Sequence, residues 1–392
     1  MTDVVVAGGG PAGSATALLL ARAGVAVRIV ERARFPRTKV CGEYLNAGAV
    51  EALERLAVLD ALAADAGPLR GVRLRAAGAA PVALAFARTS LACPRAALDA
   101  ILLEAARAAG AAVDRAHVED VLREGGRCAG LRVRDEDGVL REVRARAVVG
   151  ADGTGSLTAR KLGLATAARG RARYALGGHY EGFTGLDAHV EMYCGAGAYF
   201  ALNPLREPGR ANVMVVVPRA RLARWSADVD AGLGGAAAAL AHGARSFEGA
   251  TRAGPRVAIG PLAHEVRRAA APGALLAGDA AGFVDPFTGQ GVFLALTSAE
   301  DAAATILAAL RDPAREAVLF EQYARRRARE LAIRRRLAAT IALLVAVPPL
   351  ARRAATRLQR FPDAAAALVE ALAGTAPPEG AFRPAVLGRL LA

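Results

Sequence analysis

The stretch DVVVAGGGPAGSATALLLARAGVAVRIVER, residues 3–32, decides the fold of this 392-residue chain. Residues 4–6 are a short β-branched apolar run, which predicts a buried strand. A glycine turn with the spacing G-x-G-x-x-G follows, and residues 14–23 have a helical pattern that Gly24 ends. Residues 25–30 predict a second strand, which ends at Glu31. This order of strand, turn, helix, strand and acid predicts a βαβ unit that binds a dinucleotide.

The residues of the turn each have a physical role. Gly8 permits the tight turn, Gly10 lets the backbone approach a pyrophosphate, and Gly13 lets the helix pack closely on the strand. Unpaired N–H groups at the helix N-terminus favour a phosphate. The Glu31 carboxylate, at the tip of the second strand, can accept hydrogen bonds from ribose hydroxyls. The residues expected to bind the dinucleotide are Gly8, Gly10, Pro11, Ala12, Gly13, Glu31 and Arg32.

Three later segments add further motifs. In residues 93–113, Arg95 followed by Leu98-Asp99 opens an amphipathic helix. Residues 145–164 contain a buried strand that ends in the turn GADG. Residues 273–310 contain a strand, the dipeptide Gly278-Asp279, the loop DPFTGQG and a long helix. With these motifs, residues 1 to about 310 resemble the two-domain FAD-dependent oxidoreductases, which include aromatic hydroxylases and geranylgeranyl reductases.

The resemblance implies an α/β fold in two domains. The first is an FAD-binding, doubly wound, Rossmann-like domain with a three-layer sheet, expected in residues 1–69, 92–171 and 255–330. The second is a substrate domain on a mostly antiparallel β-sheet, expected in residues 70–91 and 172–254. Residues 331–392 are expected to form a helical C-terminal tail.

The resemblance also implies roles for single residues. Arg95 would lie near the ribityl and phosphate portion of FAD, and Asp279 would hold the ribityl chain. The loop at residues 286–291 would lie against the isoalloxazine ring, where a helix N-terminus stabilises negative charge. Asp152 is either a cofactor contact or a turn residue only. The additional FAD-binding residues are therefore Arg95, Asp152, Gly278, Asp279, Pro286, Gly289, Gln290 and Gly291.

The expected substrate domain has strand patterns joined by hairpin turns. Residues 70–91 predict two short strands, and residues 172–254 predict further strands with a helix at about 219–245. Ala201 and Asn203 stand where geranylgeranyl reductases typically carry Trp and Phe. Halogenation is not expected, since flavin halogenases use a Trp-x-Trp motif and this chain has one tryptophan. The candidate cavity residues are Tyr174, His179, Tyr180, Glu191, Tyr193, Tyr199, Phe200 and Asn203.

The composition limits the other function classes. The formal net charge is +14, and the positively charged residues are almost all arginines. No nucleic-acid-binding motif accompanies them, so no nucleic-acid partner is expected. The four cysteines have no C-x-x-C spacing, which predicts no metal site. Residues 2–7 already read as a strand, so no signal peptide is expected. We expect a reducing, cytoplasmic setting.

The tail contains an apolar run, residues 337–351, with arginines on both sides. The run is too short and too broken by proline to span a bilayer. It could lie in a membrane interface, cap the substrate pocket or form a dimer contact. The interfacial alternative would make the protein peripheral to a membrane, and the sequence leaves its oligomeric state open.

Three functions are compatible with these motifs. The first is FAD-dependent reduction of a C=C bond in a bulky apolar molecule, isoprenoid-like or polyketide-like, by hydride from flavin N5. The second is an NAD(P)H-dependent flavin monooxygenase, a hydroxylase or epoxidase. The third is a non-catalytic carrier of lipid or prenyl ligands. No second G-x-G-x-x-G unit is present, so NAD(P)H is expected to bind only transiently as the electron donor.

The stretch RTKVCGEYLNAGAV, residues 37–50, is neither a clear strand nor a clear helix. In geranylgeranyl reductase-like proteins a Cys-Gly element at this place lies beside the isoalloxazine ring. The resemblance therefore makes Cys41 and Glu43 the candidate catalytic residues, Cys41 as a proton donor or a redox-sensitive neighbour of the flavin, and Glu43 as a group that orients a donor or braces the loop. The alternative is an inert buried cysteine, with Glu43 near the N-terminus of the next helix, where a carboxylate is favoured.

Overall fold

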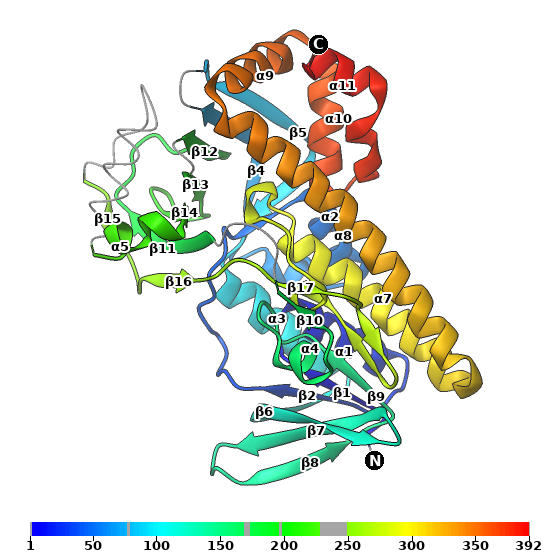
Figure 1. Cartoon of the computed structure of the whole chain (residues 1–392). Coiled ribbons are helices and arrows are strands. Elements are labelled where there is room, and N and C mark those ends of the chain that lie inside the picture. The colour runs from blue at the N-terminus through cyan, green and yellow to red at the C-terminus, as the bar shows by residue number, and fades with distance from the viewer. Residues whose placement is uncertain (1, 77–78, 168–172, 196–197, 228–248, 392) are drawn as a thin grey trace.

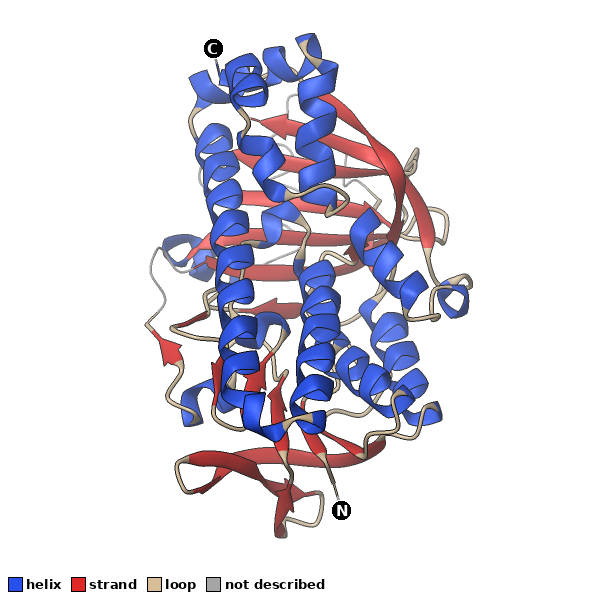
Figure 2. Ribbon diagram, turned by 90° about the vertical axis from the view of Figure 1, so that its right-hand side faces the viewer, coloured by secondary structure: helices blue, strands red, loops and turns tan. Residues whose placement is uncertain are grey.

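Two β-sheets lie one above the other along the long axis of the molecule (Figure 1, Figure 2). The helix α8 (Glu316–Ala346) runs beside both and contacts a strand of each. The computed structural model describes residues 2–76, 79–167, 173–195, 198–227 and 249–391. The expected α/β fold with a helical C-terminal region is confirmed.

The first sheet has the strand order β18-β19-β9-β1-β2-β6-β7-β8. Its central strands β19, β9, β1, β2 and β6 are parallel, and β18, β7 and β8 pair antiparallel to their neighbours. The strands are β1 (Val4–Ala7), β2 (Val27–Glu31), β6 (Ala112–Glu124), β7 (Arg127–Asp135), β8 (Leu140–Arg144), β9 (Ala147–Gly150), β18 (Ala270–Ala271) and β19 (Ala274–Leu276). Every residue of β1 is buried, as the apolar run predicts for a central parallel strand.

Helices cover one face of this sheet. The helix α1 (Pro11–Arg22) packs on β1 and β2, and it contacts α3 (Arg95–Ala108) and α7 (Gly291–Arg311). The strand β7 contacts β9, which is not its neighbour in the sheet, so the β6-β7-β8 meander forms a further layer. The helix α1 begins three residues earlier than the pattern predicted, because Pro11 is pre-organised for the first helical position after the extended Gly10.

The second sheet has the order β15-β11-β14-β13-β12-β4-β5-β3, and β16 also pairs with β11. All pairs are antiparallel except β12 with β4. The predicted short strands of residues 70–91 are longer than expected, and they join the same sheet. The strands are β3 (Tyr44–Leu45), β4 (Gly67–Ala76), β5 (Val82–Ala92), β11 (Arg173–Glu181), β12 (His189–Gly195), β13 (Ala198–Pro204), β14 (Ala211–Pro218), β15 (Thr251–Arg252) and β16 (Val257–Ile259).

The second sheet has two apolar faces, which follow from the alternation of side chains along a strand. One face carries Phe200, Val213 and Val215 in a separate core. The other carries Tyr199, Met214 and Val216, and it packs against Val40 and Phe287 of the first domain's loops. We call this second surface the inner face. It places the second sheet over the loops in which the sequence predicts the site.

The remaining elements connect and cover the sheets. A small sheet pairs β10 (Ala165–Thr166) with β17 (Glu265–Val266). The predicted helix at about 219–245 is present as α5 (Arg219–Ala227), and residues 228–245 lie outside the described part of the chain. The other helices are α2 (Ala47–Arg55), α4 (Leu157–Lys161), α9 (Pro348–Arg360), α10 (Pro362–Ala373) and α11 (Pro384–Leu391), with short 3-10 turns at Asp60–Leu62, Gly278–Ala281, Pro286–Thr288, Pro313–Arg315 and Pro378–Phe382.

The C-terminal helices begin inside the expected FAD-binding range. The helix α8 continues through residues 330 and 331 without a break. Its axis and that of α9 differ by 109° across Val347, before two consecutive prolines. The helix α7 is long and apolar enough to cross a membrane, but 61% of its most apolar 18-residue stretch is buried inside the protein. It packs on α1 and α8, as a core helix of this domain does.

Candidate active site

The glycine turn between β1 and α1 is tightly enclosed on one side. Gly8 has a φ of +101°, and a Cβ there would come within 2.6 Å of the Ala151 carbonyl oxygen. A Cβ on Gly13 would come within 1.9 Å of the Gly8 carbonyl oxygen, so only glycine lets α1 pack this closely on β1. Gly10 is the N-cap of α1. A Cβ placed on it would meet only the Arg37 guanidinium, at 3.4 Å. The open side of the turn is therefore at the helix N-terminus.

Glu31 holds this turn in place. One carboxylate oxygen accepts a hydrogen bond from the Gly9 N–H at 2.7 Å, and the other accepts from the Ala33 N–H at 2.8 Å. An ionised carboxylate has about four acceptor positions, so Glu31 retains capacity for a ribose hydroxyl. Arg32 follows at the strand tip and is exposed. Pro11 and Ala12 are buried in the first turn of α1.

A cluster of cationic side chains lies beside the turn. The pKa of Lys39 is lowered by burial and by the nearby charges of Arg37 and Arg95. Arg37 forms an ion pair with Asp99 at 3.2 Å, and Arg95 binds the same carboxylate through two hydrogen bonds of 2.8 Å. One carboxylate thus serves two guanidinium groups, and an anion such as a pyrophosphate would complete the charge balance. Arg37 and Lys39 were not among the predicted site residues, although both belong to the short stretch that holds Cys41.

The second and third motifs meet opposite this cluster. Thr154, two residues after Asp152, donates a hydrogen bond to the Asp279 carboxylate at 3.2 Å. Burial raises the pKa of Asp279, and Thr154, Arg95 and Lys39 partly offset that rise. Asp152 itself accepts hydrogen bonds from the Ser156 hydroxyl and from the Thr158 N–H, the latter at 2.9 Å. Its carboxylate therefore holds the start of α4, as the turn alternative predicted.

Gly278 and the loop before α7 show how closely the backbone is packed. Gly278 has a φ of +59°, and a Cβ there would lie 2.9 Å from the Ala12 Cβ. Gly289 has a φ of +65°, and a Cβ would come within 2.6 Å of the Tyr44 ring. Pro286 is exposed at the start of the loop. At Gly291, the first residue of α7, a Cβ would meet nothing within 4 Å.

Gln290 has a different environment from the glycines beside it. Its side-chain amide donates to the Leu372 carbonyl oxygen at 2.9 Å, in α10. The Gln290 side chain thus ties the loop to the C-terminal helices through its amide nitrogen, and its buried Oε1, which has no partner, and its backbone remain for a cofactor at this helix N-terminus. Asn46, the N-cap of α2, donates to the same Leu372 carbonyl at 3.2 Å. The C-terminal tail is therefore part of the scaffold of the site.

The stretch Cys41-Gly42-Glu43 forms a strained loop between the two sheets. Glu43 is buried with a φ of +56°, a left-handed conformation that is uncommon for a long side chain. Its carboxylate accepts a hydrogen bond from the Arg95 N–H at 2.9 Å, and its other oxygen lies 2.7 Å from His179 Nε2. Glu43 therefore caps α3. The alternative that placed it at the next helix is wrong in that detail, since Asn46 caps α2.

Polar residues on three adjacent strands of the second sheet contact this loop. His179 of β11 is paired with Asn212 of β14, and Asn212 is paired with Asn203 of β13. The Asn212 amide donates to the Cys41 carbonyl at 2.9 Å, and the Asn203 amide donates to the Gly42 and Glu43 carbonyls at 3.0 and 2.9 Å. The Oδ1 atoms of both asparagines are buried without a partner, so they can accept from a bound molecule.

Cys41 lies at the open side of this loop. It is half-buried, whereas the other three cysteines are buried. The Cys41 thiol sulfur accepts a hydrogen bond from the Glu43 N–H at 3.2 Å. Burial raises the pKa of the Cys41 thiol, and the nearby Arg95 only partly offsets it. The thiol is therefore protonated at neutral pH and can give a proton. Gly42 is exposed, with no atom within 4 Å of a Cβ built there.

A second polar contact joins the inner face to the loop before α7. The Tyr199 hydroxyl donates to Asp285 at 2.9 Å, and Arg173 forms an ion pair with Asp285 at 3.2 Å. Burial, followed by the Asp285 charge, raises the pKa of Tyr199 well above its usual value, which keeps its hydroxyl a donor. The Tyr199 ring packs edge-on against Phe287, with the centroids 5.0 Å apart. Asp285 thus fixes this loop from both domains.

Between these two polar contacts the inner face is entirely apolar. One row crosses five strands by successive pairing, in the order Gly177, Met214, Ala201, Met192 and Leu74. The row has no charged or hydrogen-bonding side chain. Two methionines give it a surface that adapts to irregular shapes. An apolar molecule could therefore lie along this row.

The eight candidate cavity residues divide between the two faces of the sheet. His179, Tyr199 and Asn203 lie on the inner face, where they contact the loops of the site. The other five lie on the opposite face: Tyr174, Tyr180, Glu191, Tyr193 and Phe200. Strand alternation separates the two sets, and the register of neighbouring strands decides which set faces the site.

The residues present fit FAD. The glycine turn, α1 N-terminus and Lys39-Arg37-Arg95 cluster provide for an anionic pyrophosphate. At Gly42, Gly153 and Gly291 a Cβ would meet no atom within 4 Å, so the Cys41 loop and the loops of the second and third motifs leave open space. Among the described residues, no group of three or more His, Cys, Asp or Glu could hold a metal ion. The individual cofactor contacts stay predictions.

Comparison with known protein families agrees with this geometry. The model of the family described as FAD binding domain matches residues 1–336. A menaquinone reductase of Mycolicibacterium smegmatis is 32% identical over 90% of this chain and 88% of its own length. A digeranylgeranylglycerophospholipid reductase of Methanopyrus kandleri is 31% identical over 82% and 84%. A 6-methylpretetramide 4-monooxygenase of Streptomyces rimosus is 37% identical over 41% and 40%.

Solved structures show the same fold. A flavin-dependent brominase, Bmp2, superposes with a TM-score of 0.82, at 21% identity over 95% of this chain and 93% of its own. A geranylgeranyl bacteriochlorophyll reductase-like protein from Thermoplasma acidophilum superposes with a TM-score of 0.78, at 22% identity over 99% and 98%. At these identities the likeness shows the fold alone, which reductases and halogenating enzymes share.

Proposed function

Because the chain belongs to the FAD-binding domain family and is an FAD-dependent oxidoreductase, we propose that it reduces a C=C bond in a bulky apolar molecule. The observation that carries this proposal is the apolar row that faces the loop of a protonated cysteine. Two relatives that match more than four-fifths of the chain are named as reductases of a menaquinone and of a digeranylgeranyl lipid. The carrier alternative is set aside, since the relatives are named as enzymes.

The residues of this chain have distinct parts in such a reaction. Bound FAD, once reduced, would supply a hydride to one carbon of the double bond. The second carbon needs a proton, and the Cys41 thiol is a candidate donor because burial keeps it protonated. Glu43 orients the loop and His179, because its two carboxylate oxygens contact the Arg95 N–H and His179 Nε2. The apolar row would exclude water from the reacting carbons.

The electrons for this reduction come from outside the protein. We propose NAD(P)H as the donor. It would bind only transiently, because the chain has one dinucleotide turn and FAD is expected to occupy it. NAD(P)H would reduce the enzyme by two electrons in each turnover and leave as the oxidised nucleotide. The net reaction then adds a hydride and a proton across one double bond.

A monooxygenase is the second candidate, because the named monooxygenase relative is 37% identical over its matched part. One experiment separates the two. The purified enzyme is supplied with NADPH and either a menaquinone or a digeranylgeranylglycerophospholipid, and the products are weighed by mass spectrometry. Reductase activity, assayed without oxygen gas, gives a product that keeps a gain of two hydrogens after any quinol has been reoxidised to the quinone. A product that carries label from isotopic oxygen gas, with no hydrogenated product, would show a monooxygenase and reject the proposal.

The role of Cys41 has its own test within this assay. Cys41→Ser keeps the size of the side chain but supplies a far weaker acid. We expect full FAD occupancy and a turnover lowered about 10²-fold or more, the usual range for losing a general acid. Unchanged turnover with bound FAD would make Cys41 part of the scaffold and leave the proton to water.

A further inference from the structure

An apolar corner projects from the protein where α8 meets α9. We call residues 341–350 the elbow. The side chains of Leu343 and Leu350 are 59% and 37% exposed, and they are among the few large apolar side chains exposed in the described part of the chain. Pro348 and Pro349 are exposed between them. An exposed apolar cluster of this kind marks an interaction surface.

Positive charge surrounds the elbow. Residues 331–360 contain seven arginines and no Asp or Glu. Some arginines serve the fold: Arg334 pairs with Glu330, and Arg336 stacks over Phe382. Arg352 and Arg360 are exposed on α9, which follows the elbow directly. An apolar edge with cationic flanks is complementary to an anionic lipid surface.

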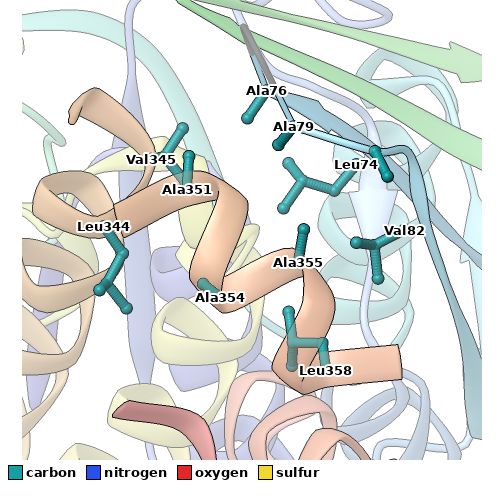
Figure 3. Close-up of a pocket in the computed structure, with 11 residues that line it drawn as sticks. Leu74, Ala76, Ala79, Val82, Leu344, Val345, Ala351, Ala354, Ala355 and Leu358 are labelled. Atoms are coloured by element: carbon teal, nitrogen blue, oxygen red, sulfur yellow. The ribbon is translucent and has the colours of Figure 1, made fainter. Parts of the chain in front are cut away.

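A shallow apolar hollow lies directly behind the elbow (Figure 3). Leu344, Val345 and Leu358 line it from the helices, and Leu74 and Val82 line it from the β4-β5 hairpin. Ala76, Ala79, Ala351, Ala354 and Ala355 add only small side chains to its wall. The hollow is therefore lined by apolar side chains.

The hollow is continuous with the apolar row of the inner face. Leu74 is both a wall of the hollow and the last member of the row that starts at Gly177. Val345 packs in the same apolar cluster as Tyr199 and Met214. Packed apolar side chains thus connect the elbow with the loops of the candidate active site.

From these contacts we propose that the elbow docks on an anionic lipid bilayer and that the hollow behind it receives the apolar substrate from the bilayer. The part concerning substrate rests on the proposed function, and the docking does not. A second copy of the chain is a poorer occupant, because a symmetric contact would bring two arginine-rich surfaces together. A bilayer offers both the apolar depth and the negative charge.

Flotation with liposomes tests the docking without substrate or turnover. We expect the FAD-loaded protein to float with phosphatidylglycerol liposomes and to float less as salt rises. The double variant Leu343→Glu with Leu350→Glu should bind about tenfold more weakly or worse, since two apolar contacts are replaced by anions. The matched control Val318→Glu changes a residue that is 55% exposed on the same helix, far from the elbow, and should float like the wild type.

Clear results would overturn the proposal. Equal flotation of the double variant and the Val318→Glu control would reject the elbow as the docking surface. A double variant that changes the particle mass by light scattering, with unchanged flotation, would make the elbow a contact between copies. Failure of the reductase assay with intact flotation would reject the proposed function and leave the docking standing.

Entry of the substrate through the hollow behind the elbow can be measured separately from the docking. Ala354→Trp would fill the hollow from α9 without touching the loops of the site. We expect this variant to keep its FAD and its flotation, and to raise KM about tenfold for a menaquinone in liposomes. Its kcat/KM for a short-tailed, water-soluble quinone should stay unchanged. An equal loss for both quinones would show a general defect and reject the path.

Discussion

At the scale of single residues, Glu43 connects more parts of the site than any motif residue. Its left-handed backbone costs about 1–3 kcal/mol, and that conformation turns its carboxylate toward both α3 and His179. Asn203 and Cys93 hold its backbone carbonyl through their N–H groups at 2.9 Å. Strain that is fixed from so many directions is typical of a functional loop.

Replacing Glu43 tests whether the carboxylate or only the shape is needed. Glu43→Ala removes the α3 cap and the His179 contact, so we expect a loss of about 1–3 kcal/mol in the free energy of unfolding. Glu43→Gln can still accept from the Arg95 N–H and should lose less than half as much. Urea unfolding measures both. The exposed Glu54→Ala, on α2, is the control, and a Gln variant as unstable as the Ala variant would contradict the capping role.

The raised pKa of Cys41 predicts how its thiol reacts. A thiol alkylates as the thiolate, and burial raises the Cys41 pKa above its usual value of about 9. Alkylation by iodoacetamide should therefore be slow at neutral pH and should increase only as the pH rises past that value. Mass spectrometry of the labelled peptide follows the profile. Half-maximal labelling below pH 8 would show a thiolate and exclude Cys41 as a proton donor.

At the scale of elements, two glycines at the N-terminus of α7 allow effects on folding and effects on cofactor binding to be tested separately. A Cβ at Gly291 would meet no protein atom within 4 Å, whereas a Cβ at Gly289 would collide with the Tyr44 ring. Gly291→Ala should leave the apo-protein as stable as the wild type and weaken FAD binding about tenfold, because the methyl group occupies cofactor space. Gly289→Ala should instead destabilise the apo-protein.

Fluorescence titration of apo-protein with FAD and thermal unfolding measure the two effects. An unchanged FAD affinity in Gly291→Ala would place the cofactor away from this helix N-terminus. A stable Gly289→Ala protein would show that the Tyr44 ring can move aside.

The motifs predicted from sequence and the contacts found in the structure differ in origin. The glycine turn, Glu31 and the Asp279 strand are local patterns, because one segment contains all the residues that the geometry needs. The His179-Asn212-Asn203 row is not local, since its members come together only through strand register. Asn212 could still have been noticed in the sequence, because it is the polar residue in the apolar run ANVMVVVP. Its partner, the Cys41 carbonyl, could not have been.

At the scale of the whole molecule, α8 makes the two sheets one unit. It contacts β18 of the first sheet and β12 of the second, and α7 lies along it. The tail was predicted to start at residue 331. The backbone shows no boundary at that residue, since helix continuity depends on local propensity and packing rather than on composition.

The hydrogen bond from Asn46 to the Leu372 carbonyl has a consequence for how the enzyme is made. The helix that follows the Cys41 loop begins at residue 47, but its capping side chain, Asn46, is held by residue 372, which is synthesised much later. At about 5–20 residues per second, the N-terminal loop waits tens of seconds for its partner. A nascent chain can form the dinucleotide turn early, yet the contact that holds the start of α2 forms only after residue 372 has been made.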